Sequence, residues 1–185
     1  MPSVPHLLQR RQFLRRSVHM AMAGATLTGL RALAAVPGAR SLAFDHTHTG
    51  ERIELVYALG DQYLPAALTS LNHFFRDHYS GDVGVIDPLL FDRLHQVQRA
   101  LGSAQAFQVI SGYRAPDTNA RLRQTRAGGV AKHSLHMEGK AIDIRLPGVA
   151  LVDLHSAALD MRAGGVGFYP REQFVHIDTG RIRHW

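Results

Sequence analysis

Apolar residues return every three or four positions in two long stretches of the chain, which predicts two amphipathic helices. The first covers residues 63–79, and the second begins at Pro88 and stops near Gly102. Asp87 before Pro88 is a typical helix start, because aspartate caps the first free N–H groups and proline fits the first helical position. Further helices are expected after Asp117 or Thr118 and from Val152 to Met161.

Shorter segments alternate polar and apolar residues or are continuously apolar, and these predict strands. They are residues 52–57, 106–111, 139–145, 166–169 and 174–178. Residues 35–49 show no clear periodicity, and we expect them to form an extended lead-in to a domain of residues 50–185. Since two helices come early and short strands dominate later, we predict an α+β fold in which helices pack on a small, largely antiparallel sheet.

The composition is that of one ordinary folded domain with a short appendage. The chain has 185 residues, of which 45% are hydrophobic and 19% are charged, and this apolar content is sufficient to bury a core. It contains no cysteine, which excludes disulfide frameworks, zinc ribbons, iron–sulfur clusters and cysteine nucleophiles. Any metal must therefore be bound by nitrogen and oxygen ligands, for which the 12 histidines are candidates.

The positive charge of the chain is concentrated at its N-terminus. Residues 1–34 contain five arginines and no acidic residue, and the remaining chain has 16 basic against 15 acidic residues. A nearly neutral body argues against a nucleic-acid partner. The pair Arg10-Arg11, followed by Phe13-Leu14, an apolar stretch and Ala32-Leu33-Ala34, is typical of a twin-arginine export signal. We therefore expect export to the periplasm, cleavage near Ala35 and no stable membrane insertion of the mature chain.

Two short clusters hold the polar residues best suited to chemistry. One runs from Lys132 to Asp143 and the other from Phe174 to Gly180. A catalytic zinc site commonly uses three histidine or carboxylate ligands and keeps a fourth position open. His136 just before a strand, Asp143 within that strand and His176 on a neighbouring strand meet this count. By spacing alone each also has a structural explanation, such as a strand-edge ion pair for Asp143 or a half-buried place in the sheet for His176.

One motif of this chain consists of Ser134, His136, Gly139, Ala141 and Asp143, followed by His176. It is similar to the zinc pattern of the D-Ala-D-Ala peptidase and Hedgehog fold superfamily. The chain also resembles the murein endopeptidase K family of exported peptidoglycan hydrolases. This resemblance is carried by residues 71–77, 110–114, 162–170 and 174–180 and by the final His184-Trp185. The resemblance implies a Hedgehog-like or DD-peptidase-like fold and hydrolysis of amide bonds in the peptide cross-links of peptidoglycan. It also implies that one zinc ion (Zn²⁺) is bound by His136, Asp143 and His176.

Two further residues are candidates for catalytic groups. Arg114 follows the predicted strand 106–111, and its guanidinium suits either a developing oxyanion or a carboxylate of the peptide stem. Asp178 lies two residues after His176, so both side chains face one side of a strand. Asp178 is therefore expected either to be the general base or to orient a ligand histidine.

The chain departs from the superfamily pattern at one position. Many members place an acidic residue three positions before the last histidine, and this chain has Gln173 there, which cannot accept a proton in that role. The neighbouring Glu172 is expected to face the opposite side of the strand. His133 and Ser134 are candidates for substrate or loop contacts, and a role as fourth zinc ligand is also open for His133.

Three functions are compatible with these residues. The resemblance favours a murein endopeptidase that takes part in cell-wall remodelling. A D-Ala-D-Ala carboxypeptidase would use the same zinc site on uncross-linked stems, whereas a non-catalytic, zinc-stabilised murein-binding module would close the site with a fourth ligand such as His133. In each case the partner is a peptidoglycan peptide stem, and a monomer is the default expectation for a murein hydrolase of this size.

Overall fold

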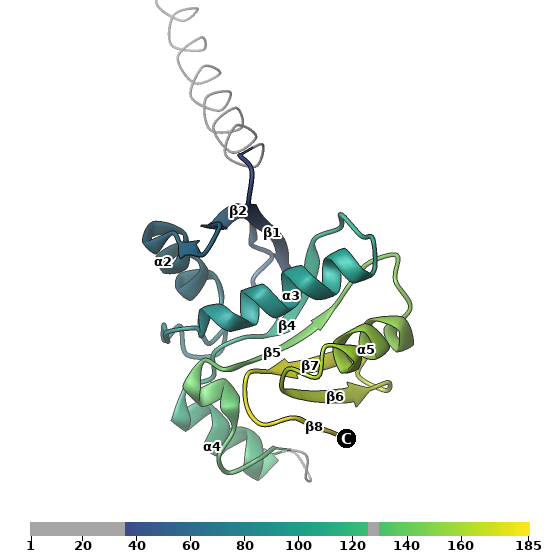
Figure 1. The fold of residues 1–185 in the computed structure, drawn as a ribbon. Helices are drawn as coiled ribbons and strands as arrows, with labels where there is room; N and C mark the ends of the chain where they lie inside the picture. Colours follow the sequence, from purple (N-terminus) through teal and green to yellow (C-terminus); the bar gives the residue numbers. More distant parts are fainter. Residues whose placement is uncertain (1–35, 126–129) are drawn as a thin grey trace, which may run out of the picture.

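One mixed sheet organises the part of the chain that the computed structural model describes, residues 36–125 and 130–185. The export signal predicted at residues 1–34 lies outside this part. The sheet has the strand order β3-β2-β1-β4-β5-β7-β6-β8, and helices pack against it (Figure 1). The strands are β1 (Ala39–His46), β2 (Arg52–Leu59), β3 (Gln62–Tyr63), β4 (Phe107–Ser111), β5 (Ala141–Arg145), β6 (Gly165–Tyr169), β7 (Phe174–Asp178) and β8 (Arg183–His184). The helices are α2 (Pro65–Phe74), α3 (Pro88–Ala100), α4 (Pro116–Thr125), α5 (Leu151–Asp160) and the short 3-10 helix η1 (Leu135–Glu138). None of these helices is long and apolar enough to cross a membrane.

The predicted α+β class is confirmed, and the sheet is mostly antiparallel. Among the described strands only the β1–β4 and β6–β8 pairs are parallel. With eight strands the sheet is larger than predicted. Strands β3 and β8 have two residues each, which is too short for an alternating pattern to be visible in the sequence.

Residues that were expected to form a lead-in instead supply a strand of the sheet. Strand β1 pairs with β2 on one side and with β4 on the other, so it is held along both edges. Leu42, Phe44 and His46 are buried at alternate positions. The polar His46 at one of these buried positions obscures the period-two pattern in the sequence. The predicted lead-in therefore includes a strand that is paired within the sheet.

The predicted helices are present, with one clear difference in length. Asp87 caps α3 as expected, since its carboxylate accepts the backbone N–H two residues further on at 3.1 Å. Helix α2 ends at Phe74 rather than near residue 79. The buried Asp77 accepts the N–H groups of Tyr79 and Ala115, and these bonds turn the chain toward the end of β4 instead of continuing the helix.

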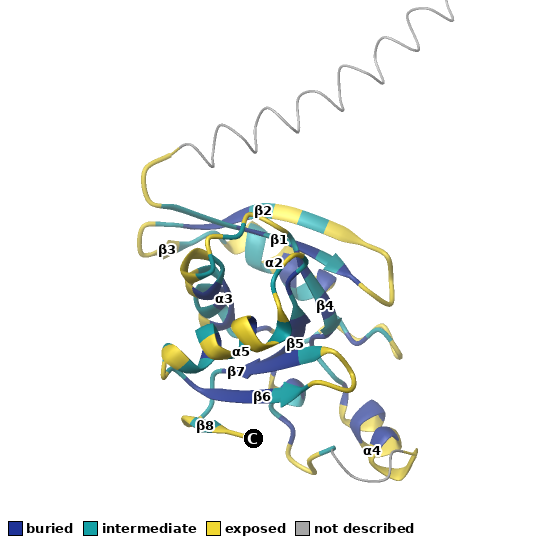
Figure 2. Cartoon of the chain, turned by 90° about the vertical axis from the view of Figure 1, so that its right-hand side faces the viewer, coloured by how far each residue is buried: buried dark blue, intermediate teal, exposed yellow. Residues whose placement is uncertain are grey.

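An aromatic cluster fills the space between the sheet and the helices. The ring of Phe44 on β1 lies 4.9 Å from that of Phe75 and 6.1 Å from that of Phe107 on β4, between ring centroids. Phe91 of α3 completes the cluster, and all four side chains are almost wholly buried. Figure 2 shows that the central strands β5 and β7 are buried along most of their length. Such strands hold their side chains in fixed positions, as a catalytic site requires.

Candidate metal centre

A glycine-terminated turn places His136 beside the sheet. His136 lies in η1, which ends at Gly139 in the left-handed conformation with φ of 65°. A Cβ atom at Gly139 would lie 2.8 Å from the carbonyl carbon of Val85 and closer still to its oxygen. The Gly139 carbonyl accepts the N–H of Asp87 at 2.9 Å. Glycine is therefore required where the chain turns from His136 into β5.

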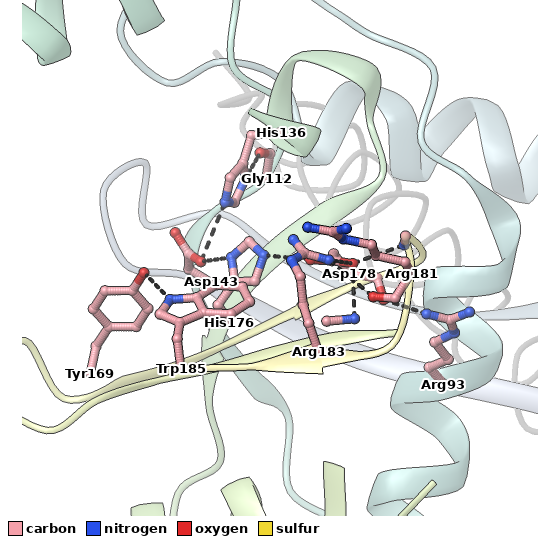
Figure 3. Close-up of polar contacts among 12 residues, drawn as sticks. Arg93, Gly112, His136, Asp143, Tyr169, His176, Asp178, Arg181, Arg183 and Trp185 are labelled. Carbon is pink, nitrogen blue, oxygen red and sulfur yellow. Dashed lines mark hydrogen bonds and ion pairs between the residues drawn. The ribbon is translucent and has the colours of Figure 1, made fainter. Parts of the chain in front are cut away.

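The pairing of β5 with β7 brings Asp143 and His176 together. These two residues are Cα partners in the antiparallel register, so their side chains lie on the same face of the sheet. His176 Nδ1 is 2.8 Å from Asp143 Oδ1, and His136 Nε2 is 3.3 Å from the same oxygen. All three residues are buried. Figure 3 shows both rings converging on this carboxylate.

The three side chains fit a metal ion. One ligand atom from each lies within 4.8 Å of the other two. Two ligands bound at about 2.1 Å to a tetrahedral zinc ion are roughly 3.4 Å apart, close to the 3.3 Å between His136 Nε2 and Asp143 Oδ1. Within residues 36–125 and 130–185 the converging group does not include His133. The described residues thus form a set of three ligands, the number typical of a catalytic zinc site.

The second nitrogen of each histidine is held by a hydrogen-bond acceptor. His136 Nδ1 lies 2.8 Å from the carbonyl oxygen of Gly112. A carbonyl can only accept, so Nδ1 carries the proton and Nε2 presents its lone pair toward Asp143. His176 Nε2 lies 3.2 Å from Asp178 Oδ2, which leaves Nδ1 to face Asp143. Both rings are thereby fixed with a defined nitrogen toward the centre.

The electrostatics of the centre favour a bound cation. Burial by itself would lower the pKa of His176, but its hydrogen bonds to Asp143 and Asp178 raise that pKa to about 9. Burial would raise the pKa of Asp143, yet the neighbouring His136 and His176 hold it far below its usual range. Positive charge is therefore stabilised between carboxylates that stay ionised.

Asp178 is fully buried and accepts hydrogen bonds on both carboxylate oxygens. Its Oδ1 accepts the N–H groups of Gly165 at 3.0 Å and Gly180 at 2.8 Å. Arg183 donates to Oδ1 at 3.1 Å and to Oδ2 at 2.6 Å. Arg93 of α3 donates to the main-chain carbonyl of Asp178 (Figure 3). Four segments of the chain thus hold this one residue in place.

These contacts also determine the acidity of Asp178. Burial would raise the pKa of its carboxyl group, but the hydrogen bonds from His176, Arg183 and the backbone hold that pKa well below its ordinary value. A strongly acidic carboxylate with its oxygens already occupied is poorly suited to accept a proton from water. The geometry instead matches a carboxylate that orients a ligand histidine, the second of the two roles expected from the sequence.

The three candidate ligands open onto a cleft of about 580 Å³. Arg114 lies in its wall, and its backbone N–H donates to the carbonyl of His136 at 3.1 Å. The Arg114 guanidinium is 3.4 Å from Asn119 Oδ1 and 3.5 Å from Ser111 Oγ, which are long distances for hydrogen bonds. The cleft is also lined by His133, Ser134, Tyr169, Glu172, Phe174 and Trp185. A cation and several polar groups therefore border the ligand set.

Glu172 lines the cleft, although strand alternation predicted that it faces away. Residues 170–173 form a turn and β7 begins only at Phe174, so alternation does not apply to them. Gln173 has a positive φ of 59°, and its side-chain amide donates to the carbonyl of Pro170. Gln173 is thus tied to its own turn. Among the described residues that line the cleft, Glu172 is the carboxylate besides Asp143.

Two contributors to the centre escaped the sequence analysis. The first is the Gly112 carbonyl, which lies directly after β4 and two residues before Arg114. A backbone acceptor leaves no side-chain signal, and its position directly after a buried strand was the available hint. The second is Arg183, whose ion pair with Asp178 depends on how the chain turns between β7 and β8. His133 and Ser134 were assigned no single role, and both lie in the cleft wall.

Comparisons with known proteins agree with the earlier resemblance. Residues 34–185 match the family model of peptidoglycan L,D-endopeptidase MepK. The chain is 50% identical over 149 residues to the peptidoglycan L,D-endopeptidase MepK of Escherichia coli strain K12, which covers 80% of this chain and 81% of that protein. It is 42% identical over 155 residues to the probable peptidoglycan L,D-endopeptidase MepK of Haemophilus influenzae, which covers 83% of each chain. No solved structure matches the chain, so the likeness to the Hedgehog fold stays a prediction.

Proposed function

The chain belongs to the family of peptidoglycan L,D-endopeptidase MepK, and on this premise we propose that it hydrolyses amide bonds in peptidoglycan cross-links with a zinc ion bound by His136, Asp143 and His176. It is a peptidoglycan peptidase of cell-wall remodelling, as its family membership establishes. The observation that supports the zinc site is the convergence of three buried ligand atoms within 4.8 Å at the wall of a large cleft.

Each ligand has a defined atom for the ion. His136 would bind through Nε2, Asp143 through Oδ1 and His176 through Nδ1, because these atoms face one another. A zinc ion with an open position supplies a Lewis acid and lowers the pKa of a bound water toward about 7. The Gly112 carbonyl keeps His136 in the tautomer that presents Nε2. The protein residues thus preorganise the centre before substrate arrives.

Asp178 is assigned to positioning His176. Its carboxylate accepts the proton of His176 Nε2 and is itself fixed by Arg183 and two backbone N–H groups. This arrangement keeps the imidazole from rotating and makes its Nδ1 a better ligand. Under this assignment the proton from the attacking water goes to another group, and Glu172 and His133 in the cleft wall are the described candidates.

Arg114 is assigned to the substrate. Its guanidinium borders the cleft close to the metal ligands, where it can stabilise an oxyanion or bind a carboxylate of the peptide stem. Two nearly parallel N–H groups make arginine suited to planar acceptors of both kinds. Arg114→Lys keeps the positive charge but removes the paired N–H groups of the guanidinium, so it tests whether the side chain binds its partner through two hydrogen bonds.

The substrate also bears on where the protein acts. We assign it to the periplasm as a monomer, exported through the twin-arginine route, on the strength of Arg10-Arg11 and the extracytoplasmic location of peptidoglycan. A variant with Lys at both positions should remain in the cytoplasm of the expressing bacterium, as measured by cell fractionation and immunoblotting. Unchanged export of this variant would contradict the route.

Muropeptides from purified sacculi provide the test of activity. The purified protein is loaded with zinc and incubated with them, and a chelator-treated sample serves as control. Mass spectrometry should show loss of cross-linked dimers and gain of monomers, and chelation should abolish both. Loss of only a terminal D-Ala would indicate a carboxypeptidase. Stoichiometric zinc with no change in any muropeptide would indicate a binding module.

A further inference from the structure

Trp185 is held against the candidate metal centre in a way that the proposed mechanism does not use. Its main chain pairs with β6, since its N–H donates to Val166 and its carbonyl accepts from Phe168. The indole centroid lies 5.2 Å from that of the His176 ring. The indole N–H donates to the Tyr169 hydroxyl at 2.7 Å (Figure 3).

Gly167 makes room for this indole. It is the Cα partner of His176 in the β6–β7 pairing, so its missing side chain lies on the face that carries the metal ligand. A Cβ atom at Gly167 would lie 2.6 to 2.8 Å from three atoms of the Trp185 ring. The Arg183 guanidinium lies 4.9 Å from the indole centroid and holds the ring from another side. The ring is thus fixed in orientation, next to His176.

The indole nevertheless remains open to the cleft. Trp185 is 48% exposed and lines the same cleft as His136, Asp143 and His176. A large aromatic ring that is rigidly held and half exposed is typical of a binding surface, since it loses little conformational entropy when a ligand covers it. A purely structural tryptophan of the core would be buried more completely.

We infer that Trp185 is a binding platform for the aliphatic side chain of the stem-peptide residue that flanks the cleaved bond. This inference rests on the proposed function, because it takes the metal centre as the point of cleavage. Consecutive residues of a peptide are about 3.8 Å apart, and the indole begins directly beside a metal ligand. A residue adjacent to the scissile bond is therefore within reach of the ring, which would bury its methylene groups.

The first test uses tryptophan fluorescence, because Trp185 is the chain's single tryptophan. A synthetic stem tetrapeptide without sugar is titrated into the zinc-loaded wild-type protein. The expected result is a saturable change in tryptophan emission, because the peptide would cover the half-exposed indole. No change with the tetrapeptide, but a saturable change with the disaccharide-bearing stem, would make the glycan the occupant and overturn the inference.

The second test separates binding from support of the metal ligand. Trp185→Ala should raise KM for a cross-linked dimer about tenfold or more, with kcat and zinc stoichiometry nearly unchanged, and Trp185→Phe should recover most of the loss. Gly167→Ala, which displaces the indole without removing it, should raise KM in the same direction. A fall in zinc content or in kcat alone for Trp185→Ala would show that the ring only supports His176.

The two proposals fail separately. If wild-type protein hydrolyses no cross-linked muropeptide, the proposed function fails. The fluorescence titration still measures whether the tetrapeptide binds at Trp185. If hydrolysis is normal and Trp185→Ala leaves KM unchanged, the platform fails and the zinc peptidase stands.

Discussion

Replacing Gly139 by alanine should destabilise the protein much more than the same change at Gly148. Both glycines have a positive φ, 65° and 76° respectively, so an alanine at either position meets a left-handed penalty of about 1–2 kcal/mol. Alanine also restricts the unfolded chain, which returns about 0.4–1 kcal/mol at each site. At Gly148 nothing lies within 4 Å of the added Cβ, and the net cost should be about 1 kcal/mol or less.

At Gly139 a second cost is added. The new Cβ would lie 2.8 Å from the Val85 carbonyl carbon, and real Cβ atoms do not approach a backbone so closely. Relief requires a backbone shift, for which overpacking costs of about 1–3 kcal/mol are typical. Since Gly139 lies between His136 and Asp143 in the chain, the shift should also separate these two ligands. The expected total loss is about 2–4 kcal/mol, together with weaker zinc binding.

Urea denaturation of the chelator-treated variants measures the free energy of unfolding without a contribution from bound metal. Competition with a chromophoric chelator then measures zinc affinity. Gly148→Ala is the matched control, because it changes the same residue type at a similar φ without the contact. Equal free energies of unfolding for the two variants, within about 0.5 kcal/mol, and equal zinc affinities would refute the role of the Val85 contact.

Three further predictions concern the metal centre and the pH dependence of stability. His136→Ala and Asp143→Ala should each abolish stoichiometric zinc binding and muropeptide hydrolysis, and wild-type turnover by metal-analysed protein would remove the site assignment. Asp178→Asn should reduce zinc affinity or turnover about 10- to 100-fold; undiminished affinity and rate would exclude both roles considered for this carboxylate. Burial, with a contribution from the nearby His48, lowers the pKa of His46 in the folded protein to about 4, against about 6.5 when unfolded. The unfolded state therefore binds more protons between these values, so stability falls as pH falls through this window, by about 2 kcal/mol from pH 7.5 to pH 5. His46→Asn keeps an acceptor for the backbone N–H groups that bond His46 Nδ1, and it should flatten this decline in urea titrations at the two pH values; an identical decline would contradict the assignment.

The elements of this fold were largely predictable because their signals are local. The helix beginning at Pro88 has its cap and its apolar face within one stretch of sequence, and the structure confirms both. His136, Gly139 and Asp143 lie within one short segment. A single turn at Gly139 into a strand was therefore enough to suggest that the side chains of His136 and Asp143 lie close together. His176 required only the assumption that its strand pairs with the strand of Asp143, which the register of β5 and β7 bears out.

Other features depend on contacts between distant segments, and no local pattern encodes them. Strand β1 was obscured because His46, a polar residue, is buried by its neighbours in the sheet. Glu172 faces the cleft because a turn, and not a strand, precedes β7. From the sequence Asp178 could be either a general base or a residue that orients a ligand histidine, and the tertiary structure surrounds its carboxylate with Arg183 and the backbone N–H groups of Gly165 and Gly180. The sequence by itself thus determined which residues can bind a metal, since ligand chemistry belongs to side chains. The tertiary structure decided which nitrogen of each histidine faces the centre and which groups are left exposed in the cleft, because hydrogen-bond partners and burial arise only when the strands are packed.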